Sequence, residues 1–305
     1  MDEGSFKKVC IIGVGLIGGS LALALKKAGL CEHVIGLGRR LESLRKALEL
    51  AVVDEIALLN PEGERETLSP REAISQADLI VLATPPSTIP AFFPLIAENA
   101  KDDCLVTDVG SVKRRIIQEA ERVLPQRLCF IGGHPLAGME KRGVDWSNAD
   151  LFERTVYVLT PCLLSNPEGM KKMRALVVSI GAVPLILDAE THDYLLAYTS
   201  HFPHIVAFAL SLLLQKAGEK NDRAYCLAAS GFRSVTRIAK SPPDIWEEIF
   251  LENRENLLKI WEEWEEIMDD MKKRLIEGNM KEELEKAKRG REFLDEITLQ
   301  EGKGI

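Results

Sequence analysis

The sequence predicts an α/β fold, a doubly wound parallel sheet followed by an all-helical C-terminal domain. Apolar runs alternate with helical patterns through the first half of the 305-residue chain, and a glycine-rich turn follows the first of these runs. From Glu190 onward no strand pattern remains. Such alternation is typical of a parallel sheet with helices on both faces. We expect an α/β domain over residues 1–163 and a helical domain over residues 164–305, because the chain is long enough for two cores.

Composition and charge narrow the class of protein. The chain is 46% apolar and 28% charged, which is typical of an ordered globular protein. The formal net charge is −8 and no long basic patch is visible, so nucleic acid is not an expected partner. Residues 1–5 lack a signal-peptide pattern, and we expect no apolar run of membrane-spanning length. We therefore expect a cytoplasmic protein with no membrane partner.

Six cysteines are scattered along the chain, at positions 10, 31, 104, 129, 162 and 226. Several lie in apolar runs, and none forms a C-x-x-C pair or a metal-ligand spacing. We expect them to be reduced core residues, and we expect no bound metal.

The first strand and turn carry the most informative motif. Gly13, Gly15 and Gly18 form a G-x-G-x-x-G pattern between an apolar strand and the apolar helix Leu21–Ala28. The first glycine permits a sharp turn, the second leaves room for a pyrophosphate, and the third lets helix and strand pack closely. Free N–H groups at the helix start favour a phosphate. This context favours a dinucleotide site over an ordinary glycine-rich turn. The predicted contacts are Gly13, Gly15, Leu16, Ile17 and Gly18.

Strands and helices alternate up to residue 187. The predicted strands are Val9–Ile12, Val34–Leu37, Leu79–Ala83, Cys104–Asp108, Cys129–Ile131, Val156–Thr160 and Val183–Leu187. The predicted helices are Leu16–Ala28, Leu41–Leu50, Ile89–Asn99, Val112–Val123 and Glu168–Ile180. We expect a polar surface loop over residues 60–69. Ligands in such sheets bind beyond the carboxyl ends of the strands. The segments expected to share that crevice are Gly13–Gly15, Gly38–Arg40, Thr84–Pro86, Asp108–Ser111 and Gly133–Pro135.

Long helices are predicted for the rest of the chain. Their ranges are Glu190–Ala217, interrupted at Pro203, then Asp222–Lys240, Asp244–Leu275 and Lys281–Thr298. In the third helix, apolar residues recur in steps of three and four, as in a helix-packing seam. The seam residues are Leu257, Ile260, Trp264, Ile267 and Met271. Together with the apolar stretch Val206–Leu214, the seam predicts a homodimer formed through the helical domain.

The end of the second strand bears on the choice between NAD and NADP. NAD-binding folds usually carry Asp or Glu there, which accepts a hydrogen bond from the ribose 2′-OH. Here the position is Gly38, followed by Arg39 and Arg40. Arginine offers a 2′-phosphate a charge-assisted partner, so NADP is favoured over NAD. Both arginines could instead stack on adenine or start a solvated helix. Thr84 and Pro85 are further candidate cofactor contacts.

Two residues at strand ends are candidates for acid–base work. His134 lies between a predicted strand and a proline, and its side chain titrates near neutral pH. Ser111 follows the preceding strand and could orient an imidazole or cap the next helix. A loop histidine can also be purely structural.

The helical half adds two polar groupings. His201 and His204 share a stripe with Asp193, Ala197 and Ser200 on an otherwise apolar helix. A metal would need a third ligand, so we favour an anion-binding or hydrogen-bonding stripe. Arg233 and Arg237 lie one turn apart in a small-residue segment, with Lys240 following. A buried arginine pair implies a carboxylate ligand, whereas the alternative is a solvated helix surface.

These motifs together resemble the prephenate and arogenate dehydrogenase family of tyrosine biosynthesis. The resemblance runs in the family's order through Gly13–Ser20, Thr107–Lys113, Gly132–Gly138, Ser200–His204 and Gly231–Ala239. It implies a Rossmann domain plus a helical domain that intertwines with its twin in a homodimer. The implied activity is NAD(P)-dependent oxidative decarboxylation of prephenate to 4-hydroxyphenylpyruvate, and tyrosine is a candidate feedback inhibitor. We expect no mutase domain before the Rossmann start, so the chain is most similar to a monofunctional prephenate dehydrogenase.

The resemblance also implies roles for individual residues. His134 would accept the proton of the substrate's ring hydroxyl, and Ser111 would help orient His134 and the substrate. Arg237 matches the arginine that binds a substrate carboxylate, and His204 matches a substrate-pocket histidine. The remaining matches to the pocket are Arg233, where some members have lysine, and Glu140.

Three alternatives remain at this point. Arogenate carries an ammonium where prephenate carries a ketone, and a protonated His204 would repel it, which favours prephenate. A β-hydroxyacid dehydrogenase would use a lysine of the helical domain as its acid–base group. A non-catalytic redox sensor would need a dinucleotide but not His134, Arg233 and Arg237 together.

Overall fold

The computed structural model of the chain describes residues 5–60 and 67–301. The chain divides into two compact units, residues 1–253 and residues 254–305, which are described in turn. The predicted polar loop 60–69 falls mainly on residues 61–66, outside the described residues.

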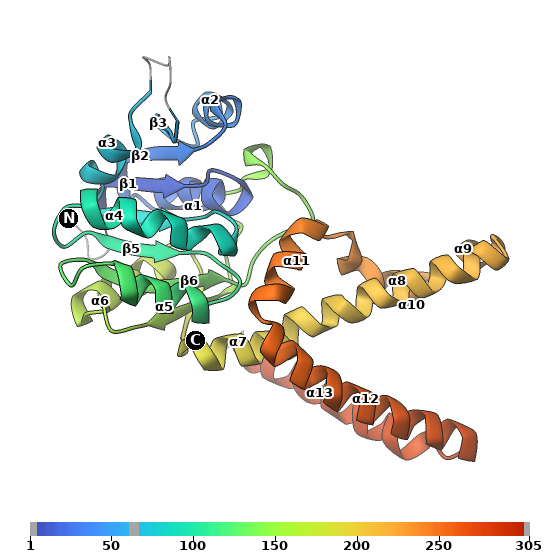
Figure 1. Ribbon diagram of the computed structural model, residues 1–305. Helices are drawn as coiled ribbons and strands as arrows, with labels where there is room; N and C mark the ends of the chain where they lie inside the picture. Colours follow the sequence, from blue (N-terminus) through green and yellow to red (C-terminus); the bar gives the residue numbers. More distant parts are fainter. Residues whose placement is uncertain (1–4, 61–66, 302–305) are drawn as a thin grey trace. The chain divides into compact units, whose positions relative to one another are not determined.

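An eight-stranded sheet forms the centre of the first unit, in the order β3-β2-β1-β4-β5-β6-β7-β8 (Figure 1). Its strands are β1 (Phe6–Ile12), β2 (Cys31–Gly38), β3 (Glu55–Leu58), β4 (Leu79–Leu82), β5 (Leu105–Asp108), β6 (Cys129–Pro135), β7 (Val156–Pro161) and β8 (Val183–Ile186). Neighbouring strands are parallel except β6 and β7. The parallel prediction is confirmed from β1 to β6, whereas β7 and β8 run the opposite way. β3, a four-residue strand at the edge of the sheet, was not predicted.

Helices cover both faces of this sheet. One core is shared by α1 (Leu16–Lys27), α2 (Leu41–Glu49) and α6 (Pro167–Ser179), and the other by α3 (Pro70–Gln76), α4 (Phe93–Asn99) and α5 (Arg114–Val123). Along β1 the residues alternate, so that Val9 and Ile11 enter the first core while Cys10 and Ile12 enter the second. The doubly wound α/β prediction is therefore confirmed. Two short turns, η1 (Pro86–Phe92) and η2 (Val144–Trp146), complete this layer.

The sheet layer extends past residue 163, because α6 and β8 follow that position. The division of the chain at residue 163 itself stays a prediction. The cysteines are all free, and Cys10, Cys104 and Cys129 are buried. Cys226 is exposed, so the expectation that all six are core residues was wrong for this one.

A helical segment completes the first unit. It comprises α7 (Ala189–Leu196), a π-helical turn η3 (Ala197–His201), α8 (Phe202–Lys220), α9 (Arg223–Cys226), α10 (Ser230–Thr236), η4 (Arg237–Lys240) and α11 (Pro243–Glu252). Pro203 lies in the first turn of α8, after the wider π turn, so the helical run continues through it. The predicted helix Asp222–Lys240 is instead three short pieces.

The run Ala189–Lys220 corrects one expectation. It is long and apolar enough to cross a membrane by length and composition alone, contrary to the expectation from the sequence. His192, Asp193, His201 and His204 interrupt the apolar pattern, which is why the run was not recognised. Only 28% of its most apolar window is buried within the chain, so this helix exposes apolar surface that a partner could cover.

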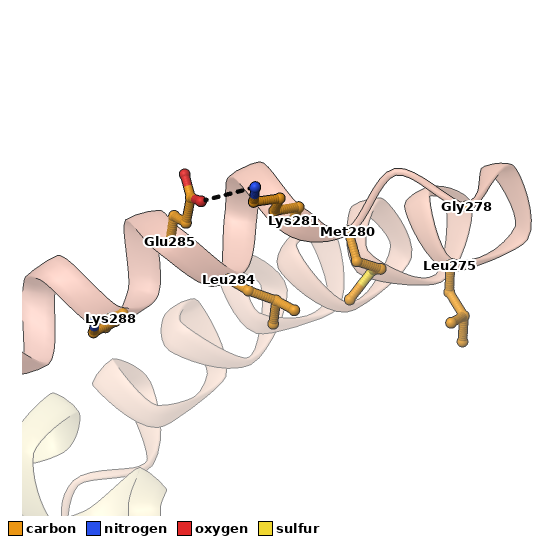
Figure 2. A pocket seen from close by; sticks show the side chains of 7 residues that line it. All are labelled: Leu275, Gly278, Met280, Lys281, Leu284, Glu285 and Lys288. Atoms are coloured by element: carbon orange, nitrogen blue, oxygen red, sulfur yellow. Dashed lines mark ion pairs between the residues drawn. The ribbon is translucent and has the colours of Figure 1, made fainter.

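The second unit is a helical hairpin of α12 (Arg254–Glu277) and α13 (Lys281–Glu301). Gly278, with φ of +76°, lies in the turn between them. The predicted helix Asp244–Leu275 is thus divided after Asn253, and the predicted seam lies on α12. Beside the turn, Leu275, Met280 and Leu284 line a shallow groove of about 530 Å³ next to the Lys281–Glu285 ion pair (Figure 2).

Candidate active site

The glycine turn between β1 and α1 has the geometry that its motif predicts. Gly13 has φ of +101°, and a Cβ there would lie 2.6 Å from the Ala83 carbonyl oxygen. A Cβ on Gly18 would collide with the Gly13 carbonyl oxygen, so close packing requires this glycine too. A Cβ on Gly15 would meet no described atom within 4 Å, because this residue faces an open cleft. The turn therefore presents bare backbone to a ligand.

A cleft of about 1200 Å³ lies against this turn. Most of the predicted cofactor contacts line it: Gly13, Gly15, Gly38, Arg39, Arg40, Thr84 and Pro85. Leu16, Ile17 and Gly18 form the first turn of α1, where Leu16 and Gly18 are buried. The predicted crevice is therefore present at the carboxyl ends of β1, β2 and β4, but Asp108–Ser111 and Gly133–Pro135 are not among the residues that line it.

The cleft fits a dinucleotide at two further points. Thr84 Oγ1 is buried and has no hydrogen-bond partner among the described residues, so it can bond a ligand. Arg39 and Arg40 are exposed at the end of β2, and Arg40 is the N-cap of α2. Ser43 and Lys46 on α2 line the same end of the cleft. Glu42 and Glu49 line this end as well, so Arg39, Arg40 and Lys46 are the groups here that could bind a phosphate at the start of α2.

Sequence reasoning missed one wall of the cleft, the loop Gly143–Asp145. Ser147 follows this loop, and its hydroxyl donates to the Gly15 carbonyl oxygen at 3.3 Å. Gly143 has φ of +96°. Gly143 was the only local signal for this turn, and nothing in the sequence connects the turn with Gly15.

His134 lies at the end of β6 and is 8% exposed. Its Nδ1 lies 2.8 Å from Nε2 of His192, at the start of the helical segment, and His192 Nδ1 lies 2.7 Å from Asp193 Oδ1. The partner that the structure gives His134 is therefore a second histidine, which the sequence did not indicate. The adjacent Asp193 had been recognised, but only as part of the His201–His204 stripe.

Asp193 also anchors the start of α5. Its carboxylate accepts from the backbone N–H of Lys113 at 2.7 Å and of Arg114 at 2.9 Å. Ser111 lies in the loop before this helix and is half-buried. Because α5 begins at Arg114, Ser111 is too early to cap it, and that alternative was wrong.

A buried ion pair lies at the end of β5. Lys113 Nζ bonds Asp108 Oδ2, and neither side chain is exposed. Asp108 also accepts from Gly110 N–H at 2.8 Å and from Gly133 N–H at 3.2 Å. The pair therefore joins β5 to the residue that precedes His134.

His201 is buried beside this group. Asn253 Nδ2 donates to the Asp193 carbonyl oxygen at 2.7 Å and lies 3.0 Å from His201 Nδ1. Asp193 and His201 are thus linked by hydrogen bonds, as the stripe suggested. Burial lowers the pKa of His201 to about 4, so its ring is neutral at pH 7.

The pKa of His134 is also lowered, well below its usual 6.5. Burial is the main cause, and nearby positive charge, including that of Lys113, adds to the effect. A depressed pKa keeps His134 unprotonated at neutral pH, as a base must be. A prediction from the sequence can assume only the unperturbed pKa.

His204 belongs to a neighbouring group. Its ring is stacked on Trp246 of α11, with centroids 3.3 Å apart and planes 20° apart. Its Nδ1 donates to the Ser200 carbonyl oxygen at 2.9 Å, so the other nitrogen of the neutral ring accepts. Burial lowers the pKa of His204; the hydrogen bond to Ser200 opposes this shift in part, and the Arg237 charge adds to it. The expectation that a protonated His204 repels an ammonium therefore loses its basis.

The two arginines do not form the expected buried pair. Arg237 is in an ion pair with Glu140, and its side chain is 65% exposed. Arg233 is exposed as well, and its Nε–H donates to the Ala228 carbonyl oxygen at 2.9 Å. The helix breaks between them at Thr236, which removes the shared face. The structure thus brings Arg237, Glu140 and His204 together and leaves Arg233 apart.

Comparisons with known proteins agree with this architecture. The family model "Prephenate dehydrogenase, nucleotide-binding domain" matches residues 21–186, and "Prephenate dehydrogenase, dimerization domain" matches residues 188–288. The prephenate dehydrogenase of Bacillus subtilis is 32% identical over 294 residues, which is 96% of this chain and 76% of that protein.

Two solved structures are similar over nearly the whole chain. Prephenate dehydrogenase from A. aeolicus, in complex with hydroxyphenyl propionate and NAD+, has a TM-score of 0.85 at 33% identity, covering 96% of this chain and 99% of that one. Arogenate dehydrogenase from Synechocystis has a TM-score of 0.77 at 29% identity, covering 94% and 99%. With its glycine turn, its cleft and both domain matches, the chain belongs to the prephenate dehydrogenase family of NAD-dependent oxidoreductases.

Proposed function

We propose that the protein catalyses the NAD(P)-dependent oxidative decarboxylation of prephenate to 4-hydroxyphenylpyruvate, as a cytoplasmic step of tyrosine biosynthesis. The observation that carries the proposal is the buried, neutral His134 at the end of β6, on the sheet edge where the dinucleotide cleft opens. Membership of the family indicates the class of reaction, which is NAD-dependent oxidation.

His134 would accept one proton from the substrate and later return it to the product. It takes the proton of the ring hydroxyl, so that the ring carbon can release hydride. The bound nicotinamide supplies the hydride acceptor. The resulting ketone loses the ring carboxylate as carbon dioxide, and the ring becomes aromatic. Its oxygen, now a phenolate, takes the proton back from His134. A single base therefore suffices, and no net proton is released.

Substrate carboxylates would be bound by the Arg237 group. Arg237 is already paired with Glu140, so an incoming carboxylate either joins that pair or displaces Glu140. His204, beside them, offers an unprotonated ring nitrogen that can accept a hydrogen bond. An ammonium can supply that bond, which makes arogenate dehydrogenase the second candidate function. The preference for prephenate thus does not depend on His204.

We propose NADP as the preferred cofactor, with NAD as the alternative. Gly38 leaves no carboxylate at the end of β2, and Arg39, Arg40 and Lys46 surround that end of the cleft at the start of α2. Arginine pairs well with a phosphate, and a helix start attracts one. The A. aeolicus enzyme was solved with NAD+, which is why NAD is the alternative.

We also propose a homodimer formed through the helical part of the chain. Leu212 and Leu213 on α8 are 60% and 63% exposed, and Ile267 on the predicted seam is 55% exposed. Apolar surface of this extent favours burial against a second copy. Light scattering at micromolar concentration should give twice the mass of the chain, and a monomer would contradict the proposal.

One set of assays tests the function. Purified protein is supplied with prephenate or arogenate and with NAD or NADP, and reduced cofactor is followed by absorbance. We expect the highest kcat/KM with prephenate and NADP, and inhibition by added tyrosine. Higher efficiency with arogenate would select the second candidate. Tight dinucleotide binding without turnover of either substrate would favour the sensor.

A further inference from the structure

The hydrogen bonds behind His134 determine which of its nitrogens carries a hydrogen. A carboxylate only accepts, so His192 Nδ1 must donate to Asp193 Oδ1. In neutral His192 the other nitrogen, Nε2, then accepts. His134 must therefore donate from Nδ1 across the 2.8 Å contact. The remaining ring nitrogen, Nε2 of His134, is left with a free lone pair, which is the state of a base.

We propose that His192 and Asp193 are positioning residues that hold His134 in this tautomer and share the proton it accepts. The inference rests on the proposed function of His134. As the substrate O–H bond breaks, the proton bonds His134 Nε2, and the Nδ1 hydrogen passes to His192 Nε2. The positive charge then lies on His192, next to the Asp193 carboxylate. When the phenolate takes its proton back from His134 Nε2, the other hydrogen returns from His192 Nε2 to His134 Nδ1. Both histidines are then in their starting tautomers.

Neighbouring residues hold the hydrogen-bonded series His134–His192–Asp193 in place. Asp193 is held by the N–H groups of Lys113 and Arg114, and Asn253 Nδ2 donates to its carbonyl oxygen. His192 is completely buried, and the side chain of Asp193 is 4% exposed, so water does not compete for these bonds. A carboxylate fixed by a helix start is suited to stabilising a transient imidazolium.

The other charged groups around His134 explain why this counter-charge is needed. The Lys113 cation is paired with Asp108, and His201 is neutral beside Asn253. In this buried group Asp193 is the carboxylate that touches the histidine chain directly. Charge that develops on His134 is therefore best stabilised through His192.

Two substitutions of His192 separate positioning from packing. In His192→Phe the ring shape is kept but both hydrogen bonds are lost. In His192→Gln the side-chain oxygen can still accept from His134 Nδ1, but it cannot take up a proton. The matched control is His33→Gln, since His33 Nε2 also lies beside a carboxylate, 3.2 Å from Glu55 Oε2, on β2 and away from this group.

The expected kinetic result is a split between kcat and KM. His192→Phe should lower kcat by roughly 10²–10⁴-fold, the range for losing a positioned base, with KM changed less than about threefold. His192→Gln should recover at least about tenfold over Phe but remain below wild type. His33→Gln should behave as wild type. Wild-type kcat in His192→Phe, or a folded His192→Gln variant no better than Phe, would overturn the proposal.

A second measurement does not require activity. Nitrogen-15 NMR of histidine-labelled protein, without substrate, reports which ring nitrogen of each of the five histidines bears a hydrogen. At pH 7 we expect hydrogen on Nδ1 of both His134 and His192, with loss of the fixed His134 tautomer in His192→Phe and its retention in His192→Gln. A His134 with hydrogen on Nε2 in wild type would overturn the inference even if His192→Phe failed to fold. Wild-type protein inactive on prephenate would instead refute the proposed function and leave the NMR result to decide the tautomer.

Discussion

Lys113 and Asp108 form a fully buried ion pair that ties the end of β5 to the start of α5. Asp108 also accepts from Gly133 N–H, in the strand that carries His134. The pair thus fixes three elements that meet at the candidate active site. Burying two charges is costly, so the pair is expected to define geometry more than to add net stability.

Removing one member of this ion pair should strongly destabilise the protein. Lys113→Met leaves the Asp108 carboxylate buried with backbone donors but no cation, which should lower the free energy of unfolding by about 3–5 kcal/mol. Urea denaturation followed by circular dichroism measures this change. The matched control is Lys172→Met, because Lys172 makes only an exposed pair with Glu168 on α6. That variant should change stability by less than about 0.5 kcal/mol. Equal stability of the two variants would show that the buried pair does not hold the site.

The parts of the site that the sequence predicted are those encoded locally. The glycine turn is one example, because Gly13, Gly15 and Gly18 follow one another within a single strand and helix start. The positions of Gly38 and His134 at strand ends followed from the same alternation. Periodicity over several residues is a strong signal, and the carboxyl edge of a parallel sheet is known once the strands are.

What the sequence could not predict depends on contacts between distant residues. His134 meets His192, which is 58 residues away, and Glu140 meets Arg237, which is 97 residues away. The cap of α5 comes from Asp193 on another helix, where local reasoning proposed Ser111. The helix α3 was not predicted, although Ser69 and Glu72 form a capping box, which is a sequence signal for the start of a helix.

Changing Gly38 should alter the choice of cofactor. In Gly38→Asp a carboxylate would repel a 2′-phosphate and accept a hydrogen bond from a 2′-OH. The new Cβ would meet only the Leu44 side-chain tip, at 3.3 Å, so the substitution should be tolerated. We expect kcat/KM with NADP to fall by about tenfold or more relative to NAD, since a charge-assisted bond is worth about 1.5–3 kcal/mol. Gly38→Ala, which adds bulk without charge, is the control. A wild-type enzyme that already uses NAD far more efficiently would contradict the assignment.

Buried histidines should make the protein sensitive to mild acid. The folded pKa of His201 is about 4 and that of His134 is also below 6.5, so the unfolded chain binds protons that the folded chain does not. Stability is therefore full above pH 6.5 and falls as pH decreases from there toward 4. His201 alone should contribute a loss of about 3 kcal/mol over that window.

The slope of stability against pH is the useful measurement here. Tm or urea midpoints are recorded between pH 7.5 and 5, and His201→Gln is compared with His33→Gln. The slope of the unfolding free energy against pH reports how many protons are taken up on unfolding. His201→Gln should lower that number by about one, whatever its effect on stability itself, and His33→Gln should leave it unchanged. An equal slope in wild type and His201→Gln would mean that folding does not lower the pKa of His201.

His134→Asn tests the catalytic base directly. Asparagine keeps the approximate size of the ring and can bond His192, but it cannot accept the hydroxyl proton. Loss of a positioned base should lower kcat by roughly 10²–10⁴-fold, while dinucleotide binding stays close to wild type because the cleft is lined by other residues.

The pH profile distinguishes this base from a structural histidine. In wild type, kcat should be flat from pH 8 down to 6.5 and decline only well below 6.5, because burial and the nearby charge of Lys113 lower the pKa of His134. As pH falls through that pKa the base becomes protonated and activity is lost, and His134→Asn should lose this acid limb. Since acid also destabilises the fold, each rate is taken only where circular dichroism shows folded protein. A variant that keeps both wild-type turnover and the acid limb would remove His134 from the mechanism and make His204 the candidate base, because its Nε2 is likewise unprotonated.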